Sequence, residues 1–105
     1  MYERNEHLKV EYKSKKLEKI CTDASFTEKI YGIKMAEKIQ LRVDQIKAAD
    51  SIDMMIKYKI GRCHLLKGKR SNQYAVDLVH PYRLVFEKRK SEIQLVCIIE
   101  IVDYH

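Results

Sequence analysis

The sequence has little glycine and proline, and the spacing of its cysteines suggests no paired function. Three glycines and one proline among 105 residues exclude long flexible linkers and leave no Gly-rich phosphate-binding loop. Cys21, Cys63 and Cys97 are odd in number and widely spaced, so we expect neither a disulfide framework nor a zinc site. No internal repeat or low-complexity segment is present. These absences favour a single domain over residues 1–105.

Long apolar segments are also missing. The first residues are charged and contain no apolar signal region, and the longest apolar run is far shorter than the roughly 20 residues that span a bilayer. We therefore expect a cytoplasmic protein that does not contact membranes. The hydrophobic share of 46% is enough for one core, and the charged share of 34% favours solubility.

Positive charge is in excess. The formal net charge is +6 and the isoelectric point is about 9.2. Such a balance favours an anionic partner, most commonly nucleic acid, because Lys and Arg that neutralise phosphates release condensed counterions. The alternative is a soluble basic protein with no such partner.

The apolar run at residues 95–102 is the strongest strand signal in the chain. It is nearly unbroken and rich in β-branched residues, which predicts a strand in the middle of a sheet, covered on both faces. The polar residues Asp103, Tyr104 and His105 follow it directly. They form either a titratable tip at one end of the sheet or a frayed polar terminus.

Apolar residues at three- and four-residue steps predict helices in the first half. Ser14 is expected to cap a helix that ends near Thr22 and Asp23. Ser25 and Glu28 have capping-box spacing and predict the start of a long amphipathic helix that runs to about Ala49. A shorter helix is expected over residues 51–58. The positions expected to face the core are Ile30, Ile33, Met35, Ala36, Ile39, Leu41, Val43, Ile46, Ile52, Met55 and Ile56.

The second half predicts strands at residues 63–66, 74–79 and 83–87 before the final one. Short turns, including His80-Pro81, join them, so they should pair as an antiparallel meander with residues 8–12 as an added edge strand. The expected fold class is α+β, with two to three helices packed on one face of a small, twisted, mainly antiparallel sheet. Alternation places Leu84 and Phe86 in the core, and Arg83, Val85 and Glu87 on the uncovered face.

One end of this sheet could gather side chains that suit cleavage of RNA. In that reaction the 2′-hydroxyl attacks the adjacent phosphorus without a metal ion, and the protein supplies a base, an acid and cations for the phosphoryl oxygens. No metal and no cofactor is predicted. His64 and Lys67 fall on opposite faces of an ideal strand, so both reach one site only if the backbone bends near Gly68. Each residue also has a simpler interpretation as a solvated charge or a half-buried strand residue. The six candidates are His64, Lys67, Arg83, Asp103, Tyr104 and His105.

These residues give the chain a resemblance to the RelE/ParE superfamily of bacterial toxins, and most of all to its HigB branch. The matching pieces are the helical half (residues 15–58), the segments 64–68, 73–76 and 82–86, and the closing Asp103-Tyr104-His105. The sequence departs from many relatives at His80-Pro81, where they carry an Asn-Gly turn. His80 itself is interpreted as a turn residue.

The resemblance implies a toxin of a type II toxin–antitoxin system. It implies a ribosome-dependent endoribonuclease that cuts translating mRNA, contacts ribosomal RNA and stops growth. The implied partner is a helix-turn-helix antitoxin similar to HigA. The toxin would bind operator DNA only through this antitoxin. In this interpretation Arg83 and Lys67 hold the scissile phosphate, and His105 moves protons with Asp103 and Tyr104. The basic loop residues Lys69 and Arg70 would bind RNA.

Two other functions remain open at this point. The same superfamily includes ParE-like inhibitors of DNA gyrase, which act by binding protein without cutting RNA. The third possibility is a basic RNA-binding accessory domain, in which the polar cluster has no catalytic role. Fold alone does not decide among them.

Overall fold

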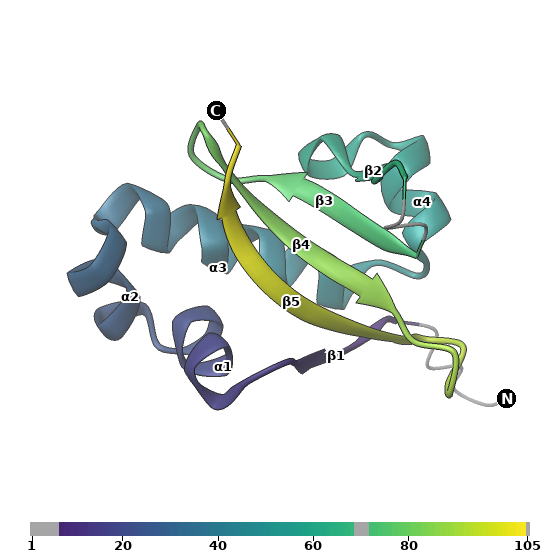
Figure 1. Cartoon of the computed structure of the whole chain (residues 1–105), viewed down its shortest axis with the longest axis horizontal. Coiled ribbons are helices and arrows are strands. Elements are labelled where there is room, and N and C mark those ends of the chain that lie inside the picture. Colours follow the sequence, from purple (N-terminus) through teal and green to yellow (C-terminus); the bar gives the residue numbers. More distant parts are fainter. Residues whose placement is uncertain (1–6, 69–71, 105) are drawn as a thin grey trace, which may run out of the picture.

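The computed structural model describes residues 7–68 and 72–104. Helices make up most of the first half and strands most of the second, and the predicted α+β class is confirmed (Figure 1). The helices are α1 (Lys15–Thr22), α2 (Ala24–Tyr31), α3 (Ile33–Ala48), α4 (Ile52–Lys57) and the short 3₁₀ helix η1 (Ile60–Arg62). The strands are β1 (Lys9–Tyr12), β2 (His64–Leu65), β3 (Gln73–Asp77), β4 (Tyr82–Lys88) and β5 (Leu95–Asp103).

The strands form one sheet in the order β1-β5-β4-β3-β2. The pairs β2–β3, β3–β4 and β4–β5 are antiparallel, which confirms the predicted meander. β1 lies at the edge, as expected, and runs parallel to β5, with Lys9 opposite Leu95 and Tyr12 opposite Ile98. β5 therefore lies inside the sheet, between β1 and β4.

The core lies between the helices and one face of the sheet. Leu84 and Phe86 on β4 are fully buried there, together with Ile39 and Ile46 from α3. Full burial of side chains of this size contributes about 1.5–3 kcal/mol each, so this packing is the main favourable term for the fold. We call the other side of the sheet the open face; Arg83 lies on it because it alternates along β4 with the core residue Leu84. Figure 1 shows the helices behind the sheet.

The long helix predicted for residues 25–49 is wrong in one respect, because the chain breaks it at Gly32. Gly32 has φ of 90°, which glycine adopts easily, and the chain turns there from α2 into α3. Asp23, rather than Ser25, caps α2 by accepting a hydrogen bond from Phe26 N at 3.1 Å. Ile30 and Ile33 flank this corner and are exposed, contrary to the expectation that they face the core.

Other burial predictions also need correction. Leu41 and Ile56 are exposed, because α3 and α4 each turn a narrower stripe to the sheet than the apolar pattern predicted. In β5 only residues 96–98 are buried, since the pairing with β1 ends at Ile98. Val85 is fully buried although it lies on the open face. By contrast, the predicted cap Ser14 accepts a hydrogen bond from Leu17 N. Ser51, the expected first residue of the short helix, caps α4 instead by accepting a hydrogen bond from Met54 N.

None of the helices within the described residues is long and apolar enough to cross a membrane.

Candidate functional site

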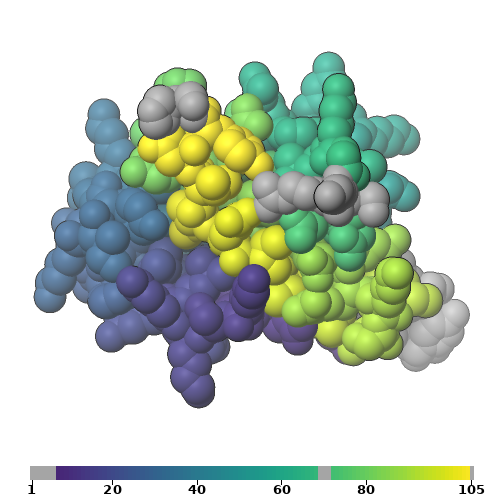
Figure 2. Space-filling view, viewed as in Figure 1, coloured from purple at the N-terminus to yellow at the C-terminus, as the bar shows by residue number. Residues whose placement is uncertain are grey.

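The β3–β4 turn and the end of β5 meet at one corner of the sheet (Figure 1). Tyr82 N donates to Val79 O at 2.8 Å, which closes the turn around the cis peptide bond between His80 and Pro81. Tyr104 N donates to Pro81 O at 3.0 Å and so attaches the end of the chain to this turn. The space-filling view shows the end of β5, in yellow, beside the green of the turn (Figure 2).

Two of the predicted site residues are in contact at this corner. Arg83 lies opposite Val102 in the β4–β5 register, so the next residue on the same face of β5 is Tyr104. The guanidinium carbon of Arg83 lies 4.7 Å from the centre of the Tyr104 ring. This cation–π contact fixes the planar group of Arg83 while leaving its outer nitrogen atoms able to donate.

Asp77 contacts three arginine side chains at this corner. It lies directly opposite Arg83 in the β3–β4 register, and its Oδ1 is 3.6 Å from Arg83 Nε. Arg62 Nε lies 2.9 Å from Asp77 Oδ2, and Arg42 Nε donates to the Asp77 carbonyl oxygen at 2.6 Å. Burial lowers the pKa of Arg42, and the Asp77 charge partly offsets that effect. Three guanidinium groups therefore converge on one aspartate.

A cavity of about 230 Å³ opens at this cluster. Arg62, Asp77, His80, Arg83 and Tyr104 line it, together with Leu78, Pro81 and Tyr82. It combines guanidinium donors that suit phosphoryl oxygens, a tyrosine face on which a base can stack and a histidine able to transfer protons. This combination of groups suits binding of a phosphodiester with one of its bases.

His64 shares the open face but lies farther from Arg83. It pairs with Ala75, which pairs with Val85, so two strand spacings, or roughly 10 Å, separate the backbones of His64 and β4. His64 Nδ1 lies 2.8 Å from the Arg62 carbonyl oxygen. Because a carbonyl only accepts, Nδ1 carries a proton, and Nε2 is the nitrogen that faces other partners.

Lys67 and Asp103 are not brought to the cavity by their backbones. Leu66 N donates to Gln73 O, and Gln73 lies four residues before Asp77 on β3, so Lys67 starts roughly 13 Å or more from the Asp77 end. Asp103 lies opposite Tyr82, whose ring contacts Tyr31 of α2 on the helix side. The other predicted residues, His105, Lys69 and Arg70, lie outside the described residues.

The sequence alone did not single out Arg42, Arg62, Asp77 or His80. A signal for Asp77 was present, because a tight turn at His80-Pro81 places residues 77 and 83 opposite each other. His80 was assigned to the turn, which is correct, but it also lines the cavity. No comparable signal was available for Arg42 or Arg62, since their approach to Asp77 depends on tertiary packing.

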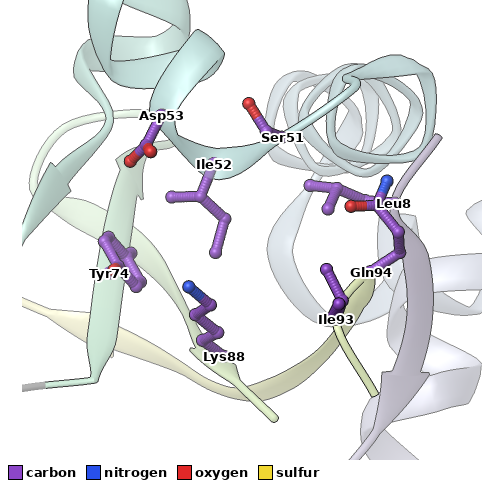
Figure 3. Close-up of a pocket in the computed structure, with 8 residues that line it drawn as sticks. All are labelled: Leu8, Ser51, Ile52, Asp53, Tyr74, Lys88, Ile93 and Gln94. Carbon is purple, nitrogen blue, oxygen red and sulfur yellow. The ribbon is translucent and has the colours of Figure 1, made fainter. Parts of the chain in front are cut away.

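A second cavity lies at the other end of the sheet, between the start of α4 and the β4–β5 turn (Figure 3). It measures about 110 Å³ and is lined by Leu8, Ile52 and Ile93, with Asp53 and Lys88 among its polar groups. This volume is about half of that of the cavity at Asp77. It contains none of the predicted site residues, so we assign it no part in the candidate site.

Among residues 7–68 and 72–104, no three His, Cys, Asp or Glu side chains converge in a way that could hold a metal ion.

No protein-family model and no curated protein matches the sequence. Solved structures do match it over nearly its whole length. A YoeB–YefM complex from Staphylococcus aureus matches with a TM-score of 0.59 and 20% identity, covering 94% of this chain and 98% of that one. A YoeB/ParE toxin from Agrobacterium tumefaciens matches with a TM-score of 0.57 and 17% identity, covering 93% and 100%. The chain therefore has the RelE-like α+β fold that these toxin structures share.

Proposed function

We propose that this protein is the toxin of a type II toxin–antitoxin system and that it is a ribosome-dependent mRNA endoribonuclease. The observation that carries the proposal is the stacking of Arg83 on Tyr104 beside a cavity rich in arginine. The fold shared with the YoeB and ParE toxins supports it. We also propose that the protein belongs to the HigB branch, and this assignment rests on the sequence resemblance alone.

The chemistry requires no metal ion. The 2′-hydroxyl of the nucleotide attacks the neighbouring phosphorus, a new P–O bond forms, and the bond to the 5′-oxygen of the next nucleotide breaks. Arg83 stabilises the charge that develops on the phosphoryl oxygens, and Tyr104 stacks on a base. His80, His64 and His105 are the candidates for moving the proton from the 2′-hydroxyl and for protonating the leaving oxygen. From the sequence resemblance, Lys67 stays a proposed phosphate contact, and Asp103 is proposed to orient His105 or share its proton transfer, although the backbones of Lys67 and Asp103 do not lie at the cavity.

The proposed partners are mRNA on the ribosome and a cognate antitoxin. The matched Staphylococcus aureus structure is a complex of YoeB with YefM, which supports a protein partner for this chain as well. A helix-turn-helix antitoxin similar to HigA, which would carry operator binding, is the form that the sequence resemblance favours. We propose that toxin and antitoxin act in the cytoplasm.

Inhibition of DNA gyrase is the alternative, since one matched structure is named a YoeB/ParE toxin. Expression of the wild-type chain separates the two. The nuclease shortens mRNAs in translating cells, whereas a gyrase inhibitor leaves mRNA intact and induces the DNA-damage response. Intact mRNA during growth arrest would rule out the nuclease.

Arg83→Ala tests the site directly in a cell-free translation reaction. We expect mRNA cleavage to fall about 10²-fold or more, as for loss of a donor that stabilises transition-state charge. The Arg83 side chain is partly exposed, so the variant should fold with a similar unfolding midpoint. Lys90→Ala, which removes an exposed charge from the β4–β5 turn, is the matched control and should cleave normally. Cleavage retained in Arg83→Ala would contradict the proposed site.

A further inference from the structure

Arg62 is presented to the cavity by a strained turn. Lys59, Gly61 and Arg62 have φ values of 56°, 58° and 55°, which lie in the left-handed region. Residues with a Cβ adopt this region rarely, and such strain persists only where the surrounding structure holds it in place. Two of these three residues are not glycine, so packing must maintain this conformation.

Arg42, His64 and Asp77 supply that packing. A Cβ added to Gly61 would lie 2.9 Å from Arg42 Nε, so the Arg42 side chain packs directly against the turn. His64 Nδ1 binds the Arg62 carbonyl oxygen, and Asp77 Oδ2 binds Arg62 Nε. Both the backbone and the side chain of Arg62 are thus held, although its side chain is 74% exposed.

The charge balance points to an anion. Within the described residues, Asp77 is the carboxylate that contacts both Arg62 and Arg83, and it does so through one Nε atom of each. A guanidinium group has five N–H donors, and its planar fork fits phosphate oxygens in a bidentate manner. An ordinary surface ion pair would pair one arginine with one carboxylate and would need no strained backbone.

We propose that Arg62 is a second RNA-binding arginine, which holds a phosphate next to the one bound by Arg83, and that Asp77 is a positioning residue. Asp77 fixes the spacing of the two guanidinium groups, so that the RNA backbone is held on both sides of the reacting nucleotide. This inference rests on the proposed nuclease function.

The binding test uses ribosomes programmed with mRNA whose A-site codon is 2′-O-methylated and therefore cannot be cut. Arg62→Gln should raise the Kd for these ribosomes about tenfold and reduce the salt slope of log K by about 1, as expected for one lost phosphate contact. Arg62→Lys keeps the charge and should recover the salt slope but only part of the affinity. Lys90→Gln removes one charge at the far end of the sheet and should leave both values unchanged.

Asp77→Asn gives a readout that a purely electrostatic role would not produce. Removing this negative charge should leave Kd unchanged or lower it, because the RNA is an anion. If Asp77 positions the arginines, the cleavage rate at saturating ribosome concentration should nevertheless fall tenfold or more. Weaker binding with an unchanged cleavage rate would overturn the positioning role.

The outcomes separate the two proposals. If the wild-type chain cuts no ribosome-bound mRNA, the nuclease function fails and the role of Arg62 fails with it. If the wild-type chain cuts but Arg62→Gln binds with unchanged Kd and salt slope, only the present inference fails. Thermal unfolding of each variant checks the fold, and Arg62→Lys provides the binding measurement if Arg62→Gln unfolds.

Discussion

The two ends of the open face use arginine differently. At the β4–β5 end, Arg89 contacts two carboxylates, Glu11 at 3.0 Å and Glu87 at 2.7 Å. At the β3–β4 end, Arg62 and Arg83 share one carboxylate within the described residues, that of Asp77. The hydrogen bond that Arg89 donates to Glu11 raises the pKa of Arg89 above its ordinary value, so this group is held firmly in its charged form.

This difference separates a structural use of arginine from a binding use. Glu11 belongs to β1 and Glu87 to β4, so Arg89 links two strands across β5. Its charge is matched by acids, and little of it is left for a ligand. Arg62 and Arg83 share the Asp77 carboxylate through one Nε atom each, so their remaining N–H donors can attract a phosphate. The same residue type thus supports the sheet at one end and is available for an anion at the other.

A second carboxylate beside Arg83 should make the β3–β4 end resemble the Arg89 end. Val102 lies directly opposite Arg83 on β5, at the distance where cross-strand side chains meet. Val102→Glu should pair with Arg83 as Glu11 pairs with Arg89, and mRNA cleavage should fall about tenfold or more because a carboxylate now competes with the phosphate.

The neutral variant Val102→Gln is the matched control for shape and polarity. It should retain most of the cleavage, and both variants should show similar unfolding midpoints, since Val102 is only partly buried. Equal cleavage by the Glu and Gln variants in the cell-free reaction would show that cleavage does not depend on an unpaired positive charge at Arg83.

Alkaline pH should weaken the core before it affects either arginine end. Burial raises the pKa of Cys21 to about 12 from an ordinary value of 9.0. Both the folded and the unfolded chain keep this thiol protonated below pH 9. Between about pH 9 and 12 the unfolded chain loses the proton first, so stability falls with rising pH.

Cys21→Ala isolates this contribution, because the variant has no thiol at that position to titrate. Between pH 8 and pH 10 its free energy of unfolding in urea should fall by about 1 kcal/mol less than that of the wild-type protein. Any cost of the smaller side chain is present at both pH values and cancels in this comparison. Parallel pH dependence in the two proteins would contradict a raised thiol pKa.

The smallest expected effect is on the stability of the Arg89 end. Arg89→Met should lower the unfolding midpoint slightly in low salt, because Glu11 and Glu87 lose their shared cation. The difference from the wild type should shrink in about 1 M salt, where the Debye length is about 3 Å. Cleavage of mRNA should remain at the wild-type level. Loss of cleavage in a folded Arg89→Met variant would show that Arg89 also takes part in RNA cleavage and is not only a structural residue.

Much of the fold could be predicted because it depends on local chemistry. The cap at Ser14 and the antiparallel order of the last strands follow from short-range patterns. The break at Gly32 was missed because the apolar spacing continues through it, although glycine permits the turn. The burial of Ile30 and Ile33 was wrongly predicted for the same reason.

The candidate site could be predicted only in part. The sequence put Arg83 on the uncovered face and named Tyr104 as a candidate, but it left the strand register open, and the β4–β5 register is what brings the two side chains together. Lys67 was predicted to join them, but it lies near Gln73, at the end of β3 away from Asp77. The reason is that β2 runs antiparallel to β3, so the chain after His64 leads away from Asp77. The predictions for His105, Lys69 and Arg70 remain predictions.

The α+β class, the strand order of the meander and the positive charge could all be predicted, since periodicity, turn residues and composition are properties of the amino-acid chain. To reach Asp77, Arg83 needs only the β3–β4 register, which the turn at His80-Pro81 sets. The approach of Arg42 and Arg62 to Asp77, by contrast, depends on tertiary packing. Both are far from Asp77 along the chain, and the turn at Gly61 and the packing of α3 bring them into contact with it. No local pattern in a sequence records that convergence.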